Sequence, residues 1–167
     1  MNLGLSYNYS DEYEMGLQSC DTGDPPSEMP RWSAQCVAEA HIGLNNTAEA
    51  IRYANAVLED GIVDPVVAVL GALVLARAGE TGRAIEIRNE FENMSQKQYV
   101  SPTVLAYASY AAGDIDRFFS YLDIAITEKA TWAPWAATVP HFRAIHGDPR
   151  FTAIVDRMNL PGQVNVN

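Results

Sequence analysis

Four stretches of this chain align with one another without gaps, and each begins 34 residues after the one before it. They start at Asn2, Cys36, Leu70 and Val104. A fixed period of this kind is typical of chains in which no unit buries its apolar face alone and neighbouring units stack. The period constrains the fold more than any single motif, and it predicts a stack of similar units.

Small residues recur at two positions of this alignment. A small side chain allows the backbones of two helices to approach closely, so these columns predict helix crossings inside each unit. Phe118 departs from the second column, but its unit carries Ser109 where the others carry larger side chains, which indicates compensation in the core. The columns are Gly4, Ala38, Ala72 and Ala106, then Gly16, Ala50 and Ala84.

A turn is predicted between the two halves of each unit. Glycine, asparagine and aspartate tolerate the left-handed backbone conformation that tight turns need. The same phase continues to Gly147 and Asp148, which marks a fifth unit. The turn column reads Asp11, Asn45, Gly79 and Gly113.

Each unit is predicted to form two helices. In residues 47–59 and 115–128, apolar side chains recur at helical spacing. The pairs Asp64-Pro65, Ser101-Pro102 and Asp148-Pro149 are typical helix starts, because the side-chain oxygen accepts from free backbone N–H groups. Strand signals are confined to a short alternation at residues 3–9. The predicted helices lie near 31–43, 47–59, 65–78, 81–94, 101–112, 115–128 and 149–158.

With these columns, the sequence resembles the tetratricopeptide repeat (TPR) family. The resemblance implies an all-α fold, a right-handed α-solenoid of TPR-like antiparallel helix pairs. It implies one domain over residues 1–167, with an incomplete first repeat at 1–23 and a degenerate C-terminal cap at 131–160. The intervening repeats occupy 31–60, 65–95 and 101–129.

The end of the chain keeps the period but breaks the pattern. Pro140 falls where a small residue is expected, so the first helix of this unit must kink or restart. The run Asp148-Pro149-Arg150-Phe151 resembles the C-terminal repeat region of bacterial multidomain regulators, such as winged-helix transcription activators and cyclase- or kinase-linked receptors. Met1 falls inside a unit, which leaves open a piece of a longer protein or a short chain with a degenerate first repeat.

The acidic residues gather near the N-terminus. The chain has a net charge of −10, and residues 1–60 contain Arg31 and Arg52 as their only bases. This charge argues against a nucleic-acid partner and favours a basic protein partner at that end. No membrane helix or signal peptide is visible, so we expect a cytoplasmic protein, with a periplasmic location as the alternative. Accordingly, Cys20 and Cys36 are expected to be reduced, although a disulfide between adjacent helices would suit a periplasmic protein.

No catalytic or metal-binding motif appears, so we expect neither an enzyme nor a cofactor or metal. His41 falls in a core column. His141 and His146 lie on either side of a kink and a turn, which is a poor arrangement for metal ligands. Arg88 and Glu92 occupy apolar columns, which is explained by rotation of the helix toward solvent or by a partly buried i,i+4 pair. Rotation is the simpler interpretation.

The TPR resemblance implies a concave groove lined by the first helices. Aromatic and apolar side chains there favour a peptide or helix of another protein, so the predicted function is a non-catalytic interaction scaffold. The alternative is a regulatory ligand-sensing module of a larger signalling or transcription-regulator protein, which would have a deep closed pocket. It also stays open that these side chains pack internally or against the chain's own irregular segments. The predicted groove residues are Leu5, Gln35, Glu39, Ile42, Val69, Leu73, Thr103, Tyr107 and Tyr110.

A stack that begins within a repeat is expected to expose an apolar edge around Leu3, Tyr7 and Leu17. Such edges recruit a cover. A weak homodimer through residues 1–45 is therefore predicted, opposed by the acidic charge of this segment and strengthened by salt.

Overall fold

The computed structural model describes residues 3–158, and this part of the chain is all-α, with no strand. The seven helices predicted from the sequence are present, and their ends lie within two residues of the expected positions. Two short 3-10 helices, η1 and η2, occupy the region around Pro140 where a break was expected. The elements are α1 (Leu3–Tyr9), α2 (Tyr13–Cys20), α3 (Arg31–Gly43), α4 (Thr47–Val57), α5 (Pro65–Arg77), α6 (Thr81–Ser95), α7 (Pro102–Ala111), α8 (Ile115–Thr127), η1 (Ala133–Ala137), η2 (Pro140–Ile145) and α9 (Pro149–Met158).

Two of the three predicted helix caps form as expected. The Asp64 carboxylate accepts from the backbone N–H of Val66 at 3.0 Å, and Asp148 accepts from that of Arg150 at 2.8 Å. Ser101 makes no side-chain cap at the start of α7, so proline at the first helical position stands there without a capping side chain. Caps satisfy backbone donors that have no partner within the helix.

The turn column adopts one conformation at four positions that are 34 residues apart. The φ angles are 64° at Asp11, 61° at Asn45, 94° at Gly79 and 79° at Gly113. Glycine adopts positive φ without steric cost, and asparagine and aspartate tolerate it best among the other residues. The left-handed backbone conformation therefore recurs with the same 34-residue period as the sequence.

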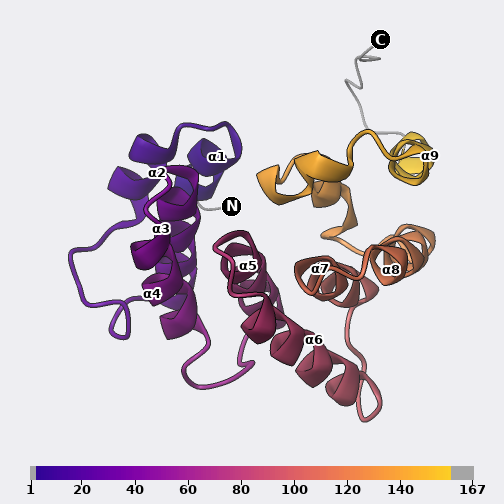
Figure 1. Cartoon of the computed structure of the whole chain (residues 1–167), viewed down its shortest axis with the longest axis horizontal. Coiled ribbons are helices and arrows are strands. Elements are labelled where there is room, and N and C mark those ends of the chain that lie inside the picture. The colour runs from indigo at the N-terminus through magenta and orange to yellow at the C-terminus, as the bar shows by residue number, and fades with distance from the viewer. Residues whose placement is uncertain (1–2, 159–167) are drawn as a thin grey trace.

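Consecutive helices pair, and the pairs follow one another in space. α1 packs on α2, α3 on α4, α5 on α6, and α7 on α8. The first helices of successive pairs also pack together, α1 on α3, α3 on α5 and α5 on α7. Figure 1 shows these pairs arranged around an arc, with the segment that contains η1 and η2 on its inner side, between α1 and α9.

The small-residue columns lie where helices meet most closely. Ala38, Ala72 and Ala84 are fully buried. A Cβ atom added at Gly4 would lie 2.0 Å from the Sγ atom of Cys20, and one added at Gly16 would lie 1.8 Å from the Oδ1 atom of Asn8. These distances are far shorter than a van der Waals contact, so the helices around both glycines are packed without room for a methyl group.

Replacing Ala84 with leucine is expected to lower the free energy of unfolding by about 1–3 kcal/mol, because the longer side chain overpacks a buried helix crossing. Ala84 lies on α6 and has no exposed surface. Urea unfolding of the variant measures the loss. An unchanged midpoint would contradict the alignment of this column with the core.

The cysteines do not match the expectation of reduced thiols. Cys20 and Cys36 form a disulfide that ties the end of α2 to α3, with Cα atoms 6.0 Å apart. The expectation was wrong because it weighed the absence of a visible signal peptide and not the distance that helix packing sets between the two side chains.

Reduction of this disulfide is expected to lower the free energy of unfolding by about 3 kcal/mol, since a cross-link over a loop of this length restricts the unfolded chain by about that much. The two cysteines are 16 residues apart in sequence. Urea unfolding with and without a reductant measures the difference. Cys20→Ser/Cys36→Ser should lose as much and should not respond to the reductant.

Two further expectations need correction. Arg88 and Glu92 remain largely buried and form an i,i+4 pair at 3.7 Å, so α6 is not rotated to expose them; Arg117 of α8 and Asp114 complete the charged cluster. His41 is half-exposed, with its ring 5.6 Å from that of Tyr53. Position in a repeat column predicted the burial of small and apolar side chains well, but it did not decide between a rotated helix and a buried pair for charged residues in apolar columns.

Candidate functional site

Part of the predicted groove is covered by another stretch of the same chain, because Glu39, Tyr107 and Tyr110 contact residues 131–146. Eight of the nine side chains are buried, and Tyr110 is half-buried. The cover is residues 131–146, which hold η1 and η2; we call this stretch the covering segment. The alternative in which the groove packs against the chain's own irregular segments therefore describes the arrangement in the structure.

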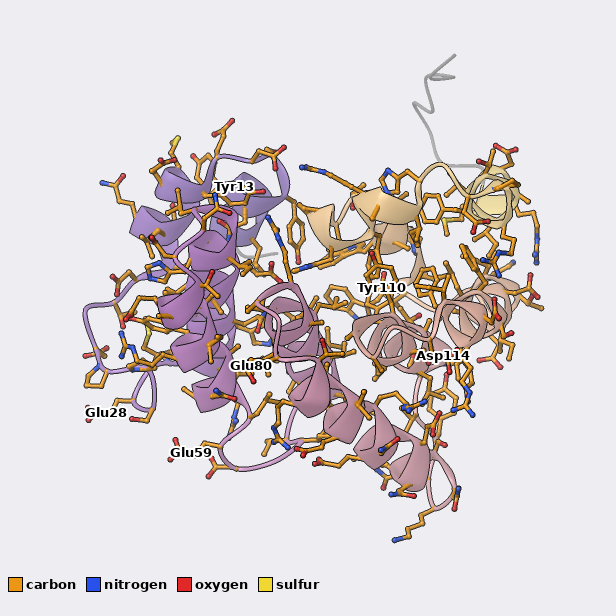
Figure 2. All side chains as sticks on the ribbon, viewed as in Figure 1. Tyr13, Glu28, Glu59, Glu80, Tyr110 and Asp114 are labelled. Atoms are coloured by element: carbon orange, nitrogen blue, oxygen red, sulfur yellow. A yellow bond between two sulfur atoms is a disulfide. The ribbon has the colours of Figure 1, made fainter. Side chains whose placement is uncertain are left out.

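Aromatic contacts attach the covering segment to α7. Phe142 is fully buried, with its ring centroid 4.7 Å from that of Tyr107 and 4.8 Å from that of Tyr110. The Tyr107 hydroxyl donates to the Trp132 carbonyl, and the Tyr110 hydroxyl donates to the His141 carbonyl, each at 2.8 Å. Figure 2 shows Tyr110 reaching from α7 toward this segment. Tyrosines that we assigned to a partner surface thus hold the chain's own backbone.

A buried pair of ionisable side chains attaches the segment to α3. The Glu39 Oε2 and His141 Nε2 atoms are 2.7 Å apart, and the two side chains are 4% and 2% exposed. The other carboxylate oxygen of Glu39 accepts from Gln35 at 3.0 Å. Because both side chains are nearly inaccessible to solvent, the pair attaches the covering segment firmly to α3.

The covering segment also meets the N-terminal helix pair. Arg143 donates to both carboxylate oxygens of Asp11 at 2.9 Å, and the ring centroids of Trp135 and Tyr9 are 5.9 Å apart. The hydrogen bond from Arg143 holds the pKa of Asp11 below its usual range. A bidentate Arg–carboxylate contact is the strongest geometry for such a pair. The segment thus joins the two ends of the arc.

Three buried polar atoms on this inner side have no hydrogen-bond partner in the described part of the chain. They are the hydroxyls of Tyr9 and Thr103 and the Oε1 atom of Gln35. Burial, and then the charge of Glu39, raises the pKa of the Tyr9 hydroxyl well above its usual range. Buried polar atoms of this kind are commonly satisfied by internal water. They mark the interior of the closed arc as polar as well as aromatic.

An open cavity remains beside the covering segment. It measures about 570 Å³ and lies between α5, α7 and η2, near the turns that begin α6 and α8. Its lining residues include Leu73, Arg77, Thr81, Tyr110, Ile115, Pro140 and Arg143. Sequence reasoning predicted Leu73 and Tyr110 as site residues but missed both arginines, since they lie 66 positions apart and belong to no common motif.

Within residues 3–158, no helix is long and apolar enough to cross a membrane. No group of three or more histidine, cysteine, aspartate or glutamate side chains in that range is placed to hold a metal ion. His141 is paired with Glu39, and the ring of His146 stacks on that of Phe151 at 4.7 Å. The described histidines therefore have packing contacts that account for them.

No match was found to a protein-family model, to a curated protein or to a solved structure.

Proposed function

We propose that this chain is a non-catalytic protein-interaction module, built as a right-handed solenoid of TPR-like helix pairs. Its support is the repeated packing of first helix on first helix, α1 to α3 to α5 to α7, together with four left-handed turns in one phase. Stacks of this kind present extended surfaces to other proteins. The function rests on this likeness of architecture and on the surface described next.

The partner is placed on the outer face of the N-terminal helix pair, and not in the concave groove. A partner reaches groove residues such as Glu39 and Tyr107 only after the covering segment leaves, which would expose Phe142 and the Glu39–His141 pair. On α1 and α2, Leu3 and Met15 are exposed by 62% and 46%. The observation that carries the proposal is the exposed acids close to Met15 in the chain, which fit a basic helix with an apolar stripe. These acids are Glu12 and Glu14.

Charge reversal tests this placement. Glu12→Lys/Glu14→Lys should reduce binding of the partner by about ten-fold or more, because it removes acidic charge at the contact. Glu59→Lys/Glu80→Lys makes the same charge change elsewhere on the surface, where both residues are exposed (Figure 2), and should leave binding unchanged. Quantitative affinity capture with each variant measures both. Equal losses in the two variants, or no loss in either, would refute the placement.

A second copy of the chain is the alternative partner for the N-terminal helix pair, and it is expected to bind weakly. Tyr7 is half-buried there, so Tyr7→Asp should weaken a homodimer through residues 1–45. Salt screens the acidic repulsion and should strengthen the dimer. Light scattering across a salt series measures the oligomeric state. A strict monomer at high protein and salt concentration would contradict the homodimer.

The disulfide favours the periplasmic alternative for location, because structural disulfides persist in oxidising compartments. Alkylation of the protein from its native source, without a reductant, tests this. Free thiols on both cysteines would contradict the periplasmic location and favour the cytoplasmic one.

The regulatory ligand-sensing module is retained as a second candidate function. The observation that favours it is the cavity of about 570 Å³ beside the covering segment, which is open and not the deep closed pocket expected of such a module. Cavities of this size suit small molecules.

A further inference from the structure

We propose that the cavity between α5, α7 and η2 binds a small organic acid, with a carboxylate at the two arginines and an apolar or aromatic body against the opposite wall. This goes beyond the protein-interaction function and stands without it. It gives the second candidate function a ligand class, and it is argued from the charge, walls and size of the cavity.

The charge of the cavity is opposite to that of the chain. The protein has a net charge of −10, yet Arg77 and Arg143 both line this one cavity. Arg143 holds Asp11, while Arg77 contacts no carboxylate at salt-bridge distance among residues 3–158. After the hydrogen bond from Arg143, the charge of Arg77 also lowers the pKa of Asp11, so the two guanidinium groups act on the same region.

Arg77 selects for a planar anion, and Arg143 adds positive charge while both of its terminal nitrogens donate to Asp11. The guanidinium group presents paired N–H donors that match the two oxygens of a carboxylate. Arg77 can donate to a ligand without breaking an ion pair of the fold, and Thr81 adds a hydroxyl to the same lining. A phosphate would be accepted by the same donors, but Leu73, Ile115 and Pro140 give the cavity an apolar wall that suits an organic body.

The remaining walls favour a body without charge. Leu73, Ile115 and Pro140 line the cavity together with Tyr110. The Tyr110 hydroxyl is occupied by the His141 carbonyl, so this side chain offers mainly its ring to a ligand. About 570 Å³ leaves room for one aromatic ring beside the carboxylate. Polar groups that fix orientation within apolar walls are the usual form of a small-molecule site.

The ligand would touch both the helix pairs and the covering segment. The lining residues come from α5, α6, α7 and α8 on one side and from Pro140 to Ala144 of η2 on the other. Occupancy would therefore favour the closed arrangement, in which η2 lies against α7.

The test uses phenylacetate as the probe, in an NMR titration of the folded chain. Saturable shift changes at Ile115, Tyr110 and Thr81 are expected with phenylacetate. Benzyl alcohol and phenethylamine, which have a similar body but no carboxylate, should bind at least about ten-fold more weakly. Equal binding of benzyl alcohol would show an apolar crevice only and overturn the proposal.

Two substitutions with opposite expected effects make the test specific. Arg77→Gln should weaken phenylacetate binding by about ten-fold, and Arg52→Gln, on an exposed face of α4, should leave it unchanged. Asp11→Asn frees Arg143 and removes a repelling charge, so it should tighten binding by roughly three-fold. Asparagine is suited to this position, because Asn45 occupies the equivalent turn at a φ of 61°.

Failure of Arg77→Gln to weaken binding, with its circular dichroism spectrum unchanged, would overturn the assignment. A short peptide that ends in phenylalanine is titrated in the same way, to distinguish a small organic acid from the C-terminal carboxylate of a protein as the ligand. If that peptide binds and phenylacetate does not, the small-molecule assignment is wrong. The result is independent of the charge-reversal test on α1 and α2, so either proposal can fail alone.

Discussion

Phe142→Ala is expected to lower the free energy of unfolding by about 3–5 kcal/mol, which is the loss typical of a large aromatic side chain removed from a core. Phe142 has no exposed surface, although it lies outside every regular α-helix. Its ring lies between those of Tyr107, Tyr110 and Phe118, at centroid distances of 4.7, 4.8 and 5.4 Å. Truncation would leave a cavity lined by the three remaining rings. Urea unfolding monitored by circular dichroism measures the loss.

Tyr99→Ala provides the matched control. It also removes an aromatic ring, but Tyr99 is 77% exposed, so its loss should be below about 0.5 kcal/mol. If Phe142→Ala lost as little as this control, the covering segment would not be part of the core. The closed arc would then be one arrangement among several, and the nine groove residues would again be available to a partner.

Glu39→Ala is expected to lower the free energy of unfolding by about 3 kcal/mol, because it leaves the imidazole of His141 buried without its partner. Both side chains are nearly inaccessible to solvent, at 4% and 2% exposure. His141→Ala should lose a similar amount, since it leaves the carboxylate with Gln35 alone. The two single variants and the double variant form a cycle, again measured by urea unfolding.

The double variant should lose clearly less than the sum of the two single losses, because the second substitution removes a group that the first has already left unpaired. Additive losses would contradict direct pairing of Glu39 with His141. Glu49→Ala provides a control at the exposed Glu49–Arg52 pair, where about 0–1 kcal/mol is expected.

The regular part of the fold was predictable because its signals are local. The predicted helix 31–43 is found as Arg31–Gly43, and Asp64 caps α5 as its position before Pro65 indicates. The helix predicted to reach residue 59 ends at Val57, and the chain turns through Leu58. Helix ends depend on caps and tertiary contacts within the last turn, which periodicity alone does not define.

The covering segment was not predictable in the same way. Its defining contact joins Glu39 to His141 across 102 positions, which is three repeat periods, so the two residues share one repeat column. Shared phase places them on equivalent faces but does not indicate that they touch. The break at Pro140 was visible in the sequence, but where the broken segment lies depends on which face of the arc remains apolar. The aromatic residues on that face, Tyr107 and Tyr110, suit a partner's peptide and the chain's own backbone equally well.

The missed pairs share one physical cause. Cys20 with Cys36, and Arg77 with Arg143, are defined by distances between side chains of different helices. The 34-residue phase places each residue on a helix face but not against a particular neighbour. A charged residue in an apolar column, such as Arg88, is the one signal that pointed to such a pair, and it lies 3.7 Å from Glu92.

The central claim is that the inner side of the arc is closed by the covering segment. Nuclear Overhauser contacts between the ring protons of Phe142 and those of Tyr107 and Tyr110, measured in labelled protein, test it most directly. The closed arrangement predicts strong contacts to both rings, whose centroids lie 4.7 and 4.8 Å from that of Phe142. Absence of these contacts, with random-coil chemical shifts over residues 131–146, would contradict it.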